Sequence, residues 1–161
     1  EALRADPQWQ PYVVFRGEYA EPAERVLETL DGGDSRALQP GRRPLFILLD
    51  ATWSEARKMF RKSPYLDGFP VLSLHPDPLS RYQLRRSKRD DHFCTSEVAA
   101  LCLELVGDAG DVQAGQVLES YLGVFTERYL QAKHQQPVDE ASSAHQRLRE
   151  LMGAATAKRD V

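Results

Sequence analysis

The sequence predicts an α/β protein with a mostly parallel sheet flanked by helices. Short apolar runs recur at 12–15, 45–49 and 71–74, each of a length typical of strands. Segments with helical spacing alternate with these runs, and such alternation is typical of a parallel sheet with crossover helices. Polar side chains follow the run at 45–49 immediately, and open parallel sheets build their sites at the carboxyl ends of their strands.

Composition limits the class of protein. The chain has 161 residues, 42% of them apolar and 28% charged, which suits one globular domain. It has no apolar run of membrane-spanning length and no signal-peptide pattern. Cys94 and Cys102 lie two helical turns apart, so we expect them to pack in the core. We therefore expect a cytoplasmic protein with no membrane contact and no metal in this chain.

The first half of the chain reads as two strand–helix pairs. Residues 12–15 form the first strand, and Glu21-Pro22 opens a helix through about Leu30. Residues 45–49 are five consecutive apolar residues, which indicates a strand buried on both faces. A helix follows from Trp53 or Ser54 to Lys62, with Ala56, Met59 and Phe60 facing inward, and Pro64 stops it.

The second half is mainly helical. After a third strand at 71–74, Thr95 is the expected N-cap of a helix ending near Val106, with Ser96 nearly as suitable. Glycines mark a break from 107 to 115, and the longest helix runs from Gln116 to about Lys133. Its apolar face comprises Val117, Leu118, Tyr121, Leu122, Phe125, Tyr129 and Leu130. We assign 1–133 to one domain and 134–161 to a polar segment with a short helix at 145–152.

Positive charge is concentrated in one region. Residues 57–89 carry nine basic and two acidic side chains, a net charge of +7, while the whole chain carries −3. A basic stripe on an acidic body is a possible footprint for a polyanion, and a solvated charged face is the alternative.

Three segments carry candidate chemistry. Asp50 could accept a proton, bind a ribose hydroxyl or cap the next helix, and Thr52 could serve as that cap equally well. Trp53 could stack on a base or fill the core. The segment 80–86 alternates cations with polar and aromatic residues, a pattern that suits phosphates and bases. The segment 94–97 begins a helix, whose free amide groups attract anions.

These segments match a known family in order. Asp50-Ala51-Thr52-Trp53 and the helix after it resemble the signature of DTW-domain proteins. The match continues through 63–66, then Ser80, Tyr82, Leu84 and Arg85, and closes with Thr95, Glu97 and Ala100. The resemblance covers roughly residues 10–107, and four motifs in the right order make it specific.

The resemblance implies a fold related to the SPOUT methyltransferases, with a C-terminal knotted cofactor site. It also implies transfer of the 3-amino-3-carboxypropyl group of S-adenosylmethionine to N3 of a uridine in tRNA, with release of methylthioadenosine. Bacterial members usually carry an N-terminal zinc-binding cysteine cluster, which this sequence lacks. Either residues precede Glu1, or this is a short variant.

The resemblance and the residue chemistry together assign roles. The catalytic candidates are Asp50, Thr52 and Trp53, with Asp50 as the base that takes or positions the N3 proton. The cofactor-binding candidates are Leu72, Ser73, Leu74, Ser80, Tyr82, Arg85, Thr95 and Glu97. The RNA-binding candidates are Arg57, Lys58, Arg61, Lys62, Arg81 and Arg86.

Two other functions stay open on the sequence. One is a SPOUT-type methyltransferase that uses S-adenosylmethionine on RNA, and the other is an RNA-binding module without catalysis. The sequence leaves open which uridine is modified and whether the protein is a monomer or a homodimer.

Overall fold

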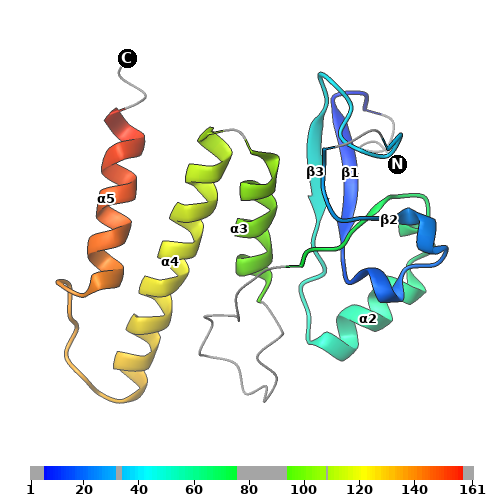
Figure 1. Ribbon diagram of the computed structural model, residues 1–161. Coiled ribbons are helices and arrows are strands. Elements are labelled where there is room, and N and C mark those ends of the chain that lie inside the picture. Colours follow the sequence, from blue (N-terminus) through cyan, green and yellow to red (C-terminus); the bar gives the residue numbers. More distant parts are fainter. Residues whose placement is uncertain (1–5, 32–33, 76–93, 108, 158–161) are drawn as a thin grey trace. The chain divides into compact units, whose positions relative to one another are not determined.

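The computed structural model describes residues 6–31, 34–75, 94–107 and 109–157. The chain divides into two compact units, Glu1–Asp77 and Pro78–Val161. The first unit contains the sheet and the second contains helices (Figure 1). The predicted α/β class is confirmed, and all strand pairings in the described residues are parallel. The knotted cofactor site and the domain boundary near residue 133 stay predictions.

Four strands of the described residues form the sheet of the first unit. They are β1 (Trp9–Val14), β2 (Val26–Leu27), β3 (Arg43–Ile47) and β4 (Val71–Leu72), arranged in the order β2-β4-β1-β3. The two inner strands are the most deeply buried, with Val13 of β1 and Val71 of β4 fully shielded from solvent. Because every pairing is parallel, all four carboxyl ends lie at one edge of the sheet.

The helix predicted for residues 21–30 is wrong. A 3-10 turn, η2 (Ala23–Arg25), is followed directly by the short strand β2. Val26 and Leu27 pair in register with Val71 and Leu72 of β4. Val26 and Leu27 therefore extend the sheet, since pairing with a neighbouring strand outweighs a weak local helix signal.

The strand predicted at 45–49 exists, but its surroundings differ from the prediction. It begins two residues earlier, ends at Ile47, and pairs with β1 at the edge of the sheet. Its residues 44–47 are half-buried rather than buried on both faces. A continuous apolar run therefore marks an edge strand here.

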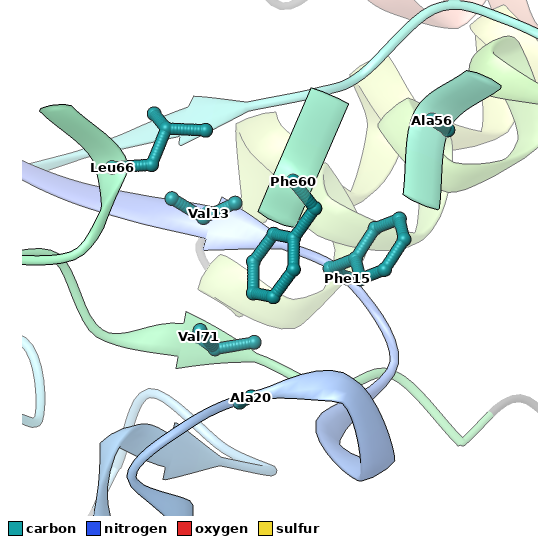
Figure 2. Packing of buried hydrophobic residues seen from close by; sticks show 7 residues of the cluster. All are labelled: Val13, Phe15, Ala20, Ala56, Phe60, Leu66 and Val71. Carbon is teal, nitrogen blue, oxygen red and sulfur yellow. The ribbon is translucent and has the colours of Figure 1, made fainter. Parts of the chain in front are cut away.

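The helix α2 (Trp53–Lys62) packs on one face of the sheet, as the sequence predicts. Ala56 and Phe60 are buried, and Phe60 points toward Phe15 and Val13 (Figure 2). Met59 is 42% exposed, so its predicted inward position is wrong. The helix contacts the core along the narrow stripe of positions 56 and 60, which lie one turn apart, and position 59 falls outside it.

The opposite face of β1 is covered by the loop at 34–39. Gln10 and Tyr12 share this face because side chains alternate along a strand. The Gln10 amide donates to the carbonyl of Ala37 (2.8 Å) and accepts from the Gln39 N–H (2.9 Å), while the Tyr12 hydroxyl donates to the Arg36 carbonyl (3.2 Å). Burial raises the pKa of Tyr12 to about 12, so this hydroxyl keeps its proton.

The described residues of the second unit form three helices side by side in chain order (Figure 1): α3 (Thr95–Val106), α4 (Ala109–Lys133) and α5 (Ser143–Ala157). Gly107 adopts φ 77° and ends α3. The expected break through residue 115 is wrong, because α4 starts at Ala109. Gly115 lies inside α4, where an added Cβ would stand 2.8 Å from the Ala100 carbonyl oxygen. Close helix packing therefore explains this glycine.

Part of the predicted apolar face of α4 is exposed in the described residues. Tyr121, Phe125 and Tyr129 are 50–61% exposed, whereas Leu118, Leu122 and Leu130 are half-buried. Both cysteines are buried as predicted, and burial raises the pKa of Cys102 to about 12. None of the helices in the described ranges is long and apolar enough for a membrane span.

Candidate functional site

The carboxyl edge of the sheet brings together the residues that follow the four strands, among them the candidates Asp50 and Ser73. Asp50 follows β3 after a two-residue gap, and Ser73 follows β4 directly. Phe15 and Gly17 follow β1, and Glu28 follows β2 directly. The parallel strands thus bring groups that are up to 58 positions apart in the chain to one edge.

Thr52 is the N-cap of α2. Its backbone N–H donates to the Glu55 carboxylate at 3.1 Å, and its hydroxyl donates to the same oxygen. These hydrogen bonds lower the pKa of Glu55 below its ordinary value. The competition between Asp50 and Thr52 for the capping position is therefore decided in favour of Thr52. A direct catalytic role for Thr52 stays a prediction.

Asp50 is exposed and lies before the helix, outside the capping position. It lies between the end of β3 at Ile47 and the N-cap Thr52, two residues before that cap. A carboxylate in this place can reach a molecule bound at the sheet edge, and Thr52 occupies the capping position of the helix.

Trp53 belongs to an aromatic cluster that joins α2 to the end of β1. Phe15 stacks on the Trp53 indole at a centroid distance of 5.4 Å and on Phe60 at 4.5 Å. The Tyr19 ring meets the indole edge-on at 5.6 Å, and the Arg16 guanidinium lies 5.7 Å from the indole centroid. Trp53 is half-buried, so it contributes to packing, and stacking on a base stays a prediction.

The residues after β4 continue the sheet ladder. The Ser73 N–H donates to the Leu27 carbonyl at 2.8 Å, and the Phe15 N–H donates to the Leu72 carbonyl at 3.1 Å. Leu72 and Ser73 are buried and Leu74 is half-buried. These hydrogen bonds hold the backbone at the carboxyl edge, and cofactor binding by residues 72–74 stays a prediction.

The candidate cations of α2 lie on its solvent side. Arg57, Lys58, Arg61 and Lys62 are all exposed. Arg57 also lies 5.9 Å from the Tyr19 ring centroid, which ties the start of this surface to the aromatic cluster. The other predicted RNA and cofactor contacts of the loop, namely Ser80, Arg81, Tyr82, Arg85 and Arg86, lie outside the described residues.

Two cofactor candidates, Thr95 and Glu97, lie in the described residues of the second unit. Cys94 is the N-cap of α3, so the predicted cap at Thr95 is wrong by one position. The reason is Glu97, whose buried carboxylate accepts the Cys94 N–H at 2.8 Å and stands three residues after the cap. Thr95 is half-buried in the first helical position. Glu97 thus has a capping role, and cofactor binding by either residue stays a prediction.

Sequence reasoning missed two residues at the sheet edge. His75 Nε2 lies 3.3 Å from Glu28 Oε1 and 3.5 Å from Ser73 Oγ. Glu28 was not a candidate because residues 21–30 were predicted to be helical. A carboxylate directly after a strand would have been one. The usable signal was the apolar pair Val26-Leu27, which is short enough for a strand and lies four residues after Pro22.

A comparison with protein families identifies the domain to which most of the chain belongs. The family model of the DTW domain matches residues 1–130. No solved structure matches the chain.

Proposed function

The chain belongs to the DTW-domain family, which is associated with tRNA modification, and we propose that it transfers the 3-amino-3-carboxypropyl group of S-adenosylmethionine to N3 of a uridine in tRNA. The second product is methylthioadenosine, and the reaction takes place in the cytoplasm. The observation that carries this proposal is Asp50, an exposed carboxylate of the family signature at the carboxyl edge of the sheet, outside the capping position of α2.

The sulfonium leaving group needs no acid catalyst, whereas the weakly acidic N3–H of uridine needs a base. Uridine N3 attacks the carbon of the aminocarboxypropyl arm that is bonded to sulfur. The N3–C bond forms as the C–S bond breaks, and the electron pair of that bond goes to the sulfur, which becomes a neutral thioether. The N3 proton passes to the Asp50 carboxylate as general base.

Orientation accounts for most of the catalysis. The methyl group and the arm are bonded to the same sulfur, so the site must present the arm to N3. A rigid carboxyl edge of the sheet favours this orientation of the arm. Phe15 is held between Trp53 and Phe60, which fixes the start of α2 against β1 close to Asp50 in the sequence.

The cofactor is held by the loop after β4 and by basic groups. Backbone groups at Leu72, Ser73 and Leu74 contact the adenosine. Ser80, Tyr82 and Arg85 are the further cofactor contacts in this proposal, and Arg85 is the group that binds the carboxylate of the arm bidentately. The start of α3, with Thr95 and Glu97, is the rival for that carboxylate.

Product analysis tests the reaction. A tRNA mixture, S-adenosylmethionine and the protein are incubated, and nucleosides and small products are identified by mass spectrometry. Aminocarboxypropyl-uridine together with methylthioadenosine is the expected result. S-adenosylhomocysteine would indicate methylation instead, and RNA binding without any product would indicate a non-catalytic module.

The role of Asp50 is tested by Asp50→Asn. Loss of a general base lowers the rate by about 10²–10⁴, measured as methylthioadenosine released per minute. Asp67→Asn is the matched control, since Asp67 is also exposed and follows η3 (Pro64–Leu66). A normal rate for Asp50→Asn would remove Asp50 from the mechanism and leave the reaction itself standing.

The exposed cations of α2 contact the RNA backbone in this proposal, together with Arg81 and Arg86. Replacing Arg61 and Lys62 by Gln should weaken tRNA binding and reduce the slope of log K against log salt by roughly 0.7–0.9 for each phosphate that the protein no longer neutralises. Arg147→Gln, which removes an exposed cation of α5, is the control. An unchanged salt slope in the double variant would show that α2 is not the RNA footprint.

A further inference from the structure

Three neighbouring strand ends form a small polar cluster at the carboxyl edge, outside the DTW signature. The Gly17 N–H, after β1, donates to Ser73 Oγ, after β4, at 3.0 Å. Ser73 Oγ lies 3.5 Å from His75 Nε2, and that nitrogen lies 3.3 Å from Glu28 Oε1, after β2. We call Gly17, Glu28, Ser73 and His75 the strand-end cluster.

The base of this cluster is closely packed. Ser73 is 3% exposed. A Cβ on Gly17 would lie 2.8 Å from Val26 Cγ1 and 3.2 Å from Ser73 Oγ, so only glycine allows the turn after β1 to approach so closely. The Ser73 hydroxyl is therefore held in a fixed position. It is the buried end of the series of contacts that runs from Ser73 through His75 to Glu28.

The outer members of the cluster are accessible. The side chains of Glu28 and His75 are 69% and 67% exposed. An ion pair of two exposed groups contributes little to stability, so stability is a weak reason for its place at the edge. His75 contacts Oε1 of Glu28, and the second oxygen, Oε2, can accept a hydrogen bond from a ligand.

We propose that Glu28, positioned by His75 and Ser73, accepts hydrogen bonds from the ribose 2′- and 3′-hydroxyl groups of S-adenosylmethionine. This inference rests on the proposed function. It assigns the ribose to a residue that none of the family motifs in the sequence includes.

The chemistry favours a diol over a cationic group. A carboxylate directly after a parallel strand is the usual acceptor for ribose hydroxyls in α/β nucleotide sites. Hydroxyl groups can bond to the carboxylate in either protonation state of His75.

Contact between Glu28 and the ribose also agrees with the proposed contact between the adenosine and residues 72–74. The adenosine lies against the backbone at residues 72–74, and Ser73 is itself a member of the cluster. A nucleoside bound there has its ribose hydroxyl groups next to the base-binding loop. Glu28 directly follows β2, which pairs with β4, the strand that precedes that loop.

Two ligands distinguish a contact of Glu28 with the ribose from a contact with the charged arm. S-adenosylmethionine carries the ribose diol and the charged arm, whereas methylthioadenosine carries the diol without the arm. Calorimetric titration of the whole chain with each ligand should show that Glu28→Ala weakens both by a similar factor, about tenfold or more. Glu28→Gln should weaken both less, since its amide oxygen can still accept.

Glu24→Ala is the matched control, since Glu24 is an exposed carboxylate four residues earlier in η2. Near-identical circular dichroism melting curves of the variants would verify the fold. A loss confined to S-adenosylmethionine would assign Glu28 to the ammonium group and overturn the proposal, as would unchanged affinity for both ligands. If the unmodified chain binds neither ligand, the proposed function fails and the inference fails with it.

Discussion

The helices α2 and α3 begin with the same local arrangement in two different surroundings. In each, a glutamate three residues after the N-cap accepts the backbone N–H of the cap residue: Glu55 from Thr52 at 3.1 Å, and Glu97 from Cys94 at 2.8 Å. Glu55 is exposed, whereas Glu97 is 8% exposed. Water can replace the first hydrogen bond when it is lost and cannot readily replace the second.

The difference shows how one sequence pattern can serve two purposes. At α2 the exposed cap fixes where the helix starts and leaves the preceding Asp50 outside the helix. At α3 the buried cap satisfies a backbone donor that would otherwise be costly. The cap residue differs accordingly: a hydroxyl that donates to the glutamate at α2, and a buried thiol at α3, whose pKa is raised by burial.

The largest expected effect is at Glu97. Glu97→Ala leaves the buried Cys94 N–H without its acceptor, and we expect the free energy of unfolding to fall by about 1.5–3 kcal/mol. Urea denaturation followed by circular dichroism measures it. Glu55→Ala is the matched variant and should have a clearly smaller effect. Equal losses would mean that burial does not distinguish the two caps.

A second, similar effect is expected where α3 meets α4. Gly115→Ala places a Cβ 2.8 Å from the Ala100 carbonyl oxygen and from Glu104 Cγ, so the helices must separate. We expect a loss of about 1–3 kcal/mol in unfolding free energy. Gly123→Ala, in the same helix, meets only the Ala144 Cβ at 3.9 Å and should stabilise by about 0.5–1 kcal/mol. Stabilisation by both substitutions would contradict close packing at Gly115.

The smallest expected effect is the pH dependence of the exposed cap. Because the folded pKa of Glu55 is lowered, its contribution is present above the unfolded pKa of about 4.3 and is lost as pH falls through the folded pKa. Asp34 acts in the same direction, since its hydrogen bond with Arg36 lowers its pKa to about 2.

Melting temperatures at pH 7 and pH 3 measure this dependence. The difference should be smaller in Glu55→Gln than in the unmodified chain, and Asp34→Asn gives the separate contribution of the other carboxylate. If Glu55→Gln keeps the full difference, the cap at α2 contributes nothing to acid sensitivity.

The sequence by itself determined the elements with strong local signals. The α/β class, the helix from Trp53 to Lys62 and the position of the DTW signature after a strand all follow from apolar spacing, capping residues and motif order. The longest helix was predicted at its carboxyl end, since Lys133 is followed by polar residues. These features depend on neighbours within a few positions, which is why one sequence suffices.

The tertiary structure decided what depends on distant partners. Val26 and Leu27 form a strand because β4 lies beside them, and this puts Glu28 next to His75, 47 positions later. Gly115 stands inside α4 rather than before it, because Ala100 and Glu104 of α3 leave no room for a side chain. Trp53 packs against Phe15 and Tyr19, residues that the sequence did not connect to it. Pairing and packing across the fold outweighed local preference at each of these positions, since they bury more surface than a local turn or cap does.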